Sequence, residues 1–193
     1  HVLHVDHADH LVLVLGRERV ARVLVLAGEH EVLLERPARV ERDLAGYDGE
    51  TKDILAQLVQ TGKGIFDRDL PTATIHGDLW MSNVFAKDDT VTTVFDLETA
   101  ENTVRLIDLA RTYTSMRFNS AYSAIEIIER LTTGYNSAAR EPLTADEQSS
   151  FNLAIGYVSG TCATWHAVHG TRYRDPYISF GKEALGYKLG AYS

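Results

Sequence analysis

Two carboxylates and one amide form the most informative pattern in this 193-residue sequence. The segment from His76 to Asn83 has the form H-x-D-x-x-x-x-N, in which Asp78 is the acid. Asp96 follows at the end of the apolar run Val91 to Phe95. Carboxylate and amide oxygens are the ligand types that Mg²⁺ takes, usually together with phosphate oxygens and water. The pattern therefore predicts a site for Mg²⁺ and phosphate groups.

A β-hairpin is expected to bring the second acid back to the amide. The apolar runs Val84 to Ala86 and Val91 to Phe95 flank four residues of turn composition, Lys87 to Thr90. A hairpin returns the chain to its starting point. Asp96 is therefore expected beside Asn83, although the two are separated in sequence.

Phosphoryl transfer is the chemistry that needs such a set, because Mg²⁺ must neutralise the charges of the transferred group. We expect Asn83 and Asp96 to be the Mg²⁺ ligands. Asp78 is then left to orient an acceptor hydroxyl and accept its proton. The alternative is a surface loop that matches the pattern by chance. The later segment Asp108-Leu109-Ala110 argues against a chance match.

These residues resemble the catalytic loop of the protein-kinase-like superfamily. The closer resemblance is to the aminoglycoside phosphotransferase family, whose relatives include choline, homoserine and fructosamine kinases. Gly77 stands where protein kinases usually carry Arg, which favours the small-molecule branch. The matching segments are His76-Gly77-Asp78, Asn83, Val94-Phe95-Asp96 and Asp108-Leu109-Ala110.

The resemblance implies a cytoplasmic phosphotransferase that moves the γ-phosphate of ATP or GTP onto a small-molecule hydroxyl, with Mg²⁺ as cofactor. It implies that Asp78 is the catalytic base and that Asn83 and Asp96 hold the metal. His76 resembles a histidine that braces the loop through backbone hydrogen bonds. Asp108 resembles an acid that ties a helix to the loop.

Three further assignments from the resemblance are less specific. Trp80 is expected either to pack under the loop or to border the acceptor pocket. Glu98 is a candidate to assist the metal or the substrate. The segment 31–36 resembles the strand that links two lobes, in which Glu35 and Arg36 would make backbone hydrogen bonds to adenine.

The N-terminal part departs from the family pattern. No lysine precedes Lys52, and no G-x-G-x-x-G segment occurs. We expect residues 1–37 to form a partial nucleotide lobe and linker strand whose earlier strands are absent, and residues 38–193 to form a helical catalytic and substrate lobe. The alternative is a catalytically inactive kinase-like binding protein, or a fragment that lacks the phosphate-binding loop.

Strands come first and helices later, which predicts an α+β fold, mostly helical, with a partial N-terminal antiparallel sheet. Residues 38–48 are charged and predicted to form a surface connection. Gly134 and Gly170 are predicted to end helices. Thr144 and Glu147 have the spacing of a capping box. The predicted strands are 11–15, 21–26 and 31–35, and the predicted helices are 50–66, 107–117, 121–134, 145–168 and 179–190.

Charge and composition limit the classes of molecule that the protein is expected to bind. The net charge of -8 disfavours nucleic acid, and no apolar run is long enough to span a membrane. Residues 67–108 contain nine acids and three bases, which favours a cationic acceptor such as an aminoglycoside. Histidines recur at every third position from His1 to His10. We interpret them as a solvated terminus, with a histidine-rich metal-binding module as the alternative.

Overall fold

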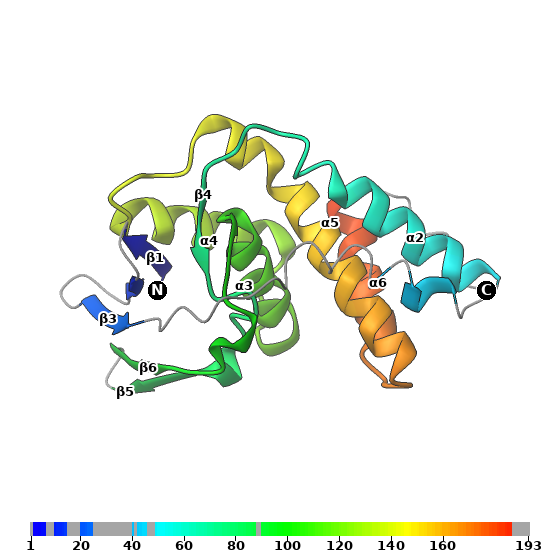
Figure 1. Ribbon diagram of the computed structural model, residues 1–193, viewed down its shortest axis with the longest axis horizontal. Helices are drawn as coiled ribbons and strands as arrows, with labels where there is room; N and C mark the ends of the chain where they lie inside the picture. The colour runs from blue at the N-terminus through cyan, green and yellow to red at the C-terminus, as the bar shows by residue number, and fades with distance from the viewer. Residues whose placement is uncertain are drawn as a thin grey trace. The chain divides into compact units, whose positions relative to one another are not determined.

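The computed structural model describes residues 2–6, 10–14, 20–24, 40, 42–45, 49–87 and 90–186 (Figure 1). They form the predicted α+β, mostly helical fold. Two compact units are present, one made of His1–His30 and Leu70–Ser149, the other of Glu31–Asp69 and Ser150–Ser193. The predicted lobe boundary between residues 37 and 38 lies outside the described residues.

An antiparallel sheet opens the first unit, in the order β1 (Val2–Asp6), β2 (His10–Val14), β3 (Val20–Leu24). Strands β2 and β3 confirm the predictions at 11–15 and 21–26. Strand β1 was missed, because its histidine was interpreted as part of a solvated terminus. The strand predicted at 31–35 lies outside the described residues.

Two further strand pairs flank the loop that contains Asp78 and Asn83, and neither pair belongs to that sheet. Strands β5 (Val84–Lys87) and β6 (Thr90–Val94) form the predicted hairpin. Strands β4 (Thr72–Ile75) and β7 (Glu101–Val104) pair antiparallel, with Ile75 opposite Glu101. The sequence did not predict the β4–β7 pair, which clamps together the two ends of the segment 76–100.

Helices α3 (Leu106–Asn119) and α4 (Ala124–Ala138) and the start of α5 (Ala145–Val168) complete this unit. The predicted helix end at Gly134 is wrong, since Gly134 lies inside α4. A glycine in a helix interior costs only about 1 kcal/mol, and the buried neighbours Leu131 and Tyr135 hold the helix in place. The capping box at Thr144 and Glu147 is confirmed by hydrogen bonds in both directions.

The second unit contains α2 (Glu50–Lys63), the rest of α5, and α6 (Arg174–Ala184). Helix α6 begins earlier than predicted because Pro176 fits its first turn, where a missing N–H costs nothing. The predicted surface connection at 38–48 is also wrong in part. Residues 40 and 42–45 are helical, and Val40 and Leu44 are buried. None of the described helices combines the length and apolar character needed to span a membrane.

A buried ion pair holds α5 to the start of α3 in the first unit. Arg105 contacts both carboxylate oxygens of Glu147, at 2.6 and 2.8 Å, and Glu147 is fully buried. The same guanidinium donates to the Tyr135 hydroxyl at 3.2 Å and to two backbone carbonyls. The hydrogen bond to Glu147 raises the pKa of Arg105 above its ordinary value. Both charges are thus fully satisfied, so neither can be removed alone without cost.

We expect Glu147→Gln to destabilise the protein by about 3 kcal/mol, because it leaves the buried Arg105 guanidinium without a compensating charge. Urea unfolding followed by circular dichroism measures the change. Glu129→Gln is the matched control, because Glu129 is exposed on α4 and is expected to change stability by less than about 0.5 kcal/mol. Equal midpoints for the two variants would contradict the assigned role of the pair.

Candidate active site

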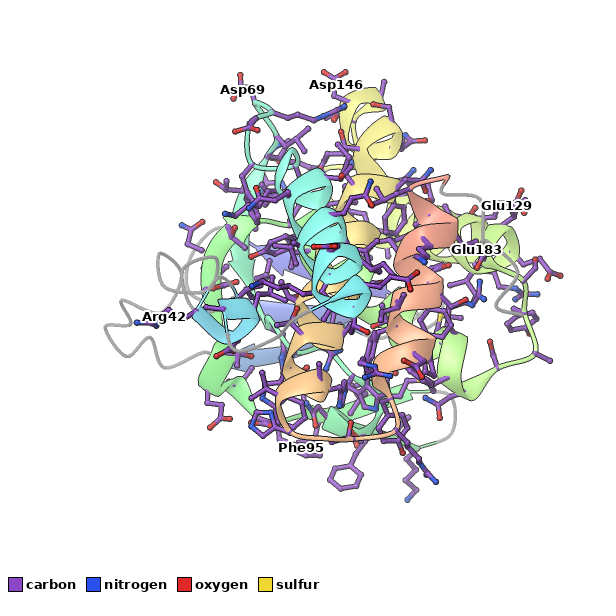
Figure 2. All side chains as sticks on the ribbon, turned by 90° about the vertical axis from the view of Figure 1, so that its right-hand side faces the viewer. Arg42, Asp69, Phe95, Glu129, Asp146 and Glu183 are labelled. Atoms are coloured by element: carbon purple, nitrogen blue, oxygen red, sulfur yellow. The ribbon has the colours of Figure 1, made fainter. Side chains whose placement is uncertain are left out.

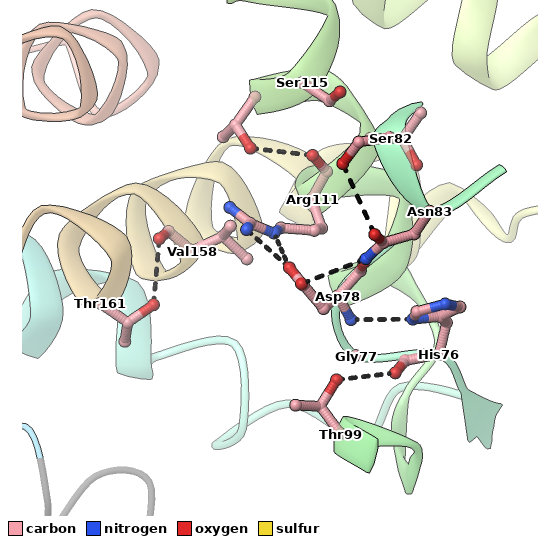
Figure 3. A network of polar contacts seen from close by, with 12 residues as sticks. His76, Gly77, Asp78, Ser82, Asn83, Thr99, Arg111, Ser115, Val158 and Thr161 are labelled. Atoms are coloured by element: carbon pink, nitrogen blue, oxygen red, sulfur yellow. Dashed lines mark hydrogen bonds and ion pairs between the residues drawn. The ribbon is translucent and has the colours of Figure 1, made fainter. Parts of the chain in front are cut away.

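The loop between β4 and β5 places an acid and an amide side by side (Figure 3). Asn83 ends the short 3₁₀ helix η1 (Met81–Asn83) and is buried. Its Nδ2 donates to the backbone carbonyl of Asp78 at 3.0 Å and approaches Oδ2 of the same residue at 3.4 Å. The five-residue spacing thus closes the loop on itself.

Asp108 of α3 anchors the start of this loop. Its two carboxylate oxygens accept the backbone N–H groups of His76 and Gly77, at 2.7 and 2.8 Å. Asp108 is 1% exposed, so these bonds are shielded from water. One buried acid therefore fixes two consecutive peptide groups immediately before Asp78.

The His76 ring joins the loop to the end of the hairpin. Its Nδ1 accepts the N–H of Asp78 at 3.2 Å, so the ring proton lies on Nε2, which donates to the Phe95 carbonyl at 2.9 Å. The N–H of Phe95 in turn donates to the carbonyl of Asn83 at 3.1 Å. The residue after Phe95 is Asp96, so both bonds fix the chain next to the second acid.

Asp96 has an unusual backbone and an exposed side chain. Its φ of 66° and ψ of 55° are left-handed, and no other described residue besides glycine has a positive φ. Such a conformation is uncommon for a residue with a side chain and clusters at functional sites. Within the described part of the chain, its carboxylate makes no hydrogen bond or ion pair. The exposed Glu98 follows in the 3₁₀ helix η2 (Leu97–Thr99).

The donor set suits a Mg²⁺ ion that is bound mainly through a substrate's phosphates. Because Nδ2 of Asn83 points at Asp78, its Oδ1 is the oxygen left for a cation, and Ser82 reaches it only at 3.5 Å. Asp96 adds an exposed carboxylate. The described residues contain no group of three or more His, Cys, Asp or Glu side chains that could hold a metal. Two protein ligands match the habit of Mg²⁺, which keeps water and phosphate oxygens.

Gly77 is required by the geometry of the loop. Its φ is +78°, and a Cβ at this position would lie 2.2 Å from the carbonyl oxygen of Thr99. The Thr99 hydroxyl also donates to the carbonyl of His76, at 3.1 Å. The loop and η2 therefore approach each other more closely than any side chain permits.

We expect Gly77→Ala to destabilise the protein by clearly more than Gly170→Ala. Both residues have a positive φ, and an alanine there costs about 1–2 kcal/mol. A Cβ on Gly170 would meet nothing within 4 Å, so only Gly77→Ala adds the clash with Thr99. Thermal unfolding of both variants separates the two costs. Equal losses of stability would show that the loop can move away from η2.

Sequence reasoning missed Arg111, which contacts Asp78 directly. Its Nε and Nη2 lie 2.7 and 2.6 Å from Oδ1 of Asp78. Its guanidinium carbon also lies 4.8 Å from the ring centroid of Trp80, which packs against Phe118. A signal was present, because Arg111 is three residues after Asp108 on the same helix and shares its face.

Of the other predicted site residues, two are described by the structure and two are not. Trp80 is half-buried against Phe118 and Arg111, and its role toward a substrate stays a prediction. Glu98 is exposed and follows Asp96 by two residues, and its role toward the metal or the substrate stays a prediction. Glu35 and Arg36, the predicted adenine contacts, lie outside the described residues.

Comparison with solved structures supports a kinase-like fold. The crystal structure of a choline/ethanolamine kinase family protein from Mesorhizobium loti matches with a TM-score of 0.60 and 14% identity, covering 84% of this chain and 56% of that chain. A Plasmodium vivax ethanolamine kinase matches with a TM-score of 0.46 and 14% identity, covering 82% of this chain and 48% of that one. The chain thus spans little more than half the length of the first structure.

Sequence comparison identifies the family. No protein with a curated description matches significantly. The model of the phosphotransferase enzyme family, APH, matches residues 8–143, which include every residue of the site described above. That span is well over half of the chain, and it confirms the resemblance found from the loop residues. The protein belongs to the APH phosphotransferase enzyme family.

Proposed function

We propose that the protein transfers the γ-phosphate of ATP or GTP to a hydroxyl group of a small molecule. The observation that carries this proposal is the loop in which the Asp78 carboxylate lies beside the Asn83 amide while the hairpin returns to Asp96. Family membership supports the reaction class. The acceptor and the nucleotide are inferences from the site.

Asp78 would act as the base. Its Oδ1 is held by Arg111, so Oδ2 is the oxygen available to an acceptor hydroxyl. The hydroxyl proton passes to Oδ2 as the acceptor oxygen bonds to the γ-phosphorus. The bond from that phosphorus to the bridging oxygen breaks, and the nucleoside diphosphate leaves with the electron pair. The carboxylate acts mainly by orienting the hydroxyl, because the transition state is loose.

Asn83 and Asp96 would hold Mg²⁺ through Oδ1 of the amide and through the carboxylate. A bound Mg²⁺ would neutralise the negative charge of the phosphates during transfer. Glu98 is a further acid close in sequence, which we propose as an aid to the metal or the acceptor. His76 and Asp108 keep the loop in place through backbone hydrogen bonds.

The acceptor we propose is a small alcohol with a cationic group, such as an amino alcohol or an aminoglycoside. The acid excess of residues 67–108 supports this choice, and Asp96 and Glu98, in and next to the proposed metal site, are both exposed. The structurally similar protein from Mesorhizobium loti is described as a choline/ethanolamine kinase family protein, and choline and ethanolamine are both amino alcohols.

A transfer screen on the full-length protein tests the proposal. ATP and GTP would each be offered with choline, ethanolamine, homoserine, aminoglycosides and simple sugars, and nucleoside diphosphate would be measured with and without Mg²⁺. We expect Mg²⁺-dependent product formation that requires one acceptor class. Binding of MgATP without transfer to any acceptor would favour the alternative of an inactive kinase-like binding protein.

A further inference from the structure

Arg111 engages one oxygen of the Asp78 carboxylate and leaves the other almost untouched (Figure 3). Its Nε and Nη2 both lie on Oδ1, at 2.7 and 2.6 Å. Oδ2 has only the Asn83 Nδ2 at 3.4 Å, which is a long contact for a hydrogen bond. The two oxygens of this acid are therefore not equivalent.

The guanidinium is itself held in place. It stacks on the Trp80 ring at 4.8 Å, and Trp80 packs against Phe118 with ring centroids 5.6 Å apart. The Arg111 side chain is 17% exposed, against 33% for Asp78. A cation fixed over an aromatic face is preorganised, so little side-chain freedom is lost in forming its ion pair.

We propose that Arg111 is a positioning residue for phosphoryl transfer: it clamps Oδ1 of Asp78 and thereby presents Oδ2 to the acceptor hydroxyl. This inference rests on the proposed function. The terminal torsion of an aspartate side chain is broad, so an unclamped carboxylate turns freely between orientations. A small misplacement of a reacting group is enough to lower a rate by about a hundredfold.

The test compares Arg111→Ala with Arg117→Ala in the full-length protein. Arg117 lies on the same helix and also contacts an aromatic residue, Tyr113, through its hydroxyl at 3.3 Å. Turnover is measured with the best acceptor of the screen, and also with water through hydrolysis of MgATP. For Arg111→Ala we expect kcat to fall about a hundredfold while KM for MgATP is unchanged. Arg117→Ala should keep the wild-type kcat.

Two readouts separate positioning from a structural role. Free guanidinium ions should restore part of the activity of Arg111→Ala, whereas Arg111→Lys should stay impaired because an ammonium lacks the planar fork. Arg111→Ala should also have no further effect in an Asp78→Asn background, because both act at one carboxylate. Additive losses, or a loss of activity that follows thermal stability without guanidinium rescue, would overturn the proposal.

The remaining outcomes assign failure to one proposal or the other. Wild-type kcat in Arg111→Ala, with Asp78→Asn inactive, would overturn the positioning role alone. A raised KM for MgATP at wild-type kcat would mean that Arg111 binds the nucleotide instead. Wild-type turnover in both variants would remove Asp78 as the base. Wild-type protein that transfers phosphate to neither an acceptor nor water would overturn both proposals.

Discussion

Asp78→Asn is expected to lower turnover by about 10²- to 10⁴-fold, the usual contribution of a positioned general base. The amide keeps the shape of the side chain but cannot take a proton. Asp78 is partly exposed and its pair with Arg111 is near the surface, so stability should change by no more than about 1 kcal/mol. Steady-state kinetics and thermal unfolding measure the two effects on the same protein.

Asp69→Asn is the matched control for this change. Asp69 is exposed, and the same loss of charge there is expected to leave kcat unaltered. Figure 2 shows Asp69 projecting from the ribbon. If Asp78→Asn kept the wild-type kcat with every acceptor that the wild-type protein uses, Asp78 would not be the base.

The hairpin and the loop could be predicted from sequence because they depend on local patterns. Two apolar runs around a polar turn determine the pair β5–β6, and that fold-back brings Phe95 to Asn83. The chemical types of Asp78 and Asn83 and their spacing carried the family assignment. The hairpin and loop needed only neighbours within the span 76–96, and the family assignment added one further short segment, Asp108-Leu109-Ala110.

Contacts across longer separations were not predictable in the same way. The strands β4 and β7 have four residues each, which is too short for the sequence pattern to distinguish a strand from a loop. Directly after β4, Asp108 holds the backbone of His76 and Gly77 from a helix thirty-two and thirty-one residues away. Arg111 reaches Asp78 across thirty-three residues. Such contacts follow from the way α3 packs under the loop, which no local pattern contains.

The left-handed backbone of Asp96 is another feature that the sequence did not reveal. Glycine would adopt this conformation at no steric cost, yet an acid occupies the position. Its exposed side chain has no hydrogen-bond partner among the described residues. Phe95, the preceding residue, projects away from the ribbon in Figure 2. An acid thus occupies a backbone conformation that glycine adopts without steric cost and that Asp and Asn tolerate better than other side chains.

On the proposed metal role, Asp96→Ala should abolish the Mg²⁺-dependent part of nucleotide binding and Asp96→Asn should weaken it, because an amide oxygen carries no charge, whereas only the alanine variant should also lose stability. Asparagine tolerates the left-handed region, but alanine does not. In the full-length protein, nucleotide at about 100 times its Kd stabilises the folded state by about 2.7 kcal/mol. Thermal shifts with ATP alone and with ATP plus Mg²⁺ measure this gain.

An undiminished Mg²⁺-dependent shift in Asp96→Asn would exclude this carboxylate as a metal ligand. Its loss in Asp96→Ala and its reduction in Asp96→Asn, with the fold of Asp96→Asn intact, would place the metal at the end of the hairpin.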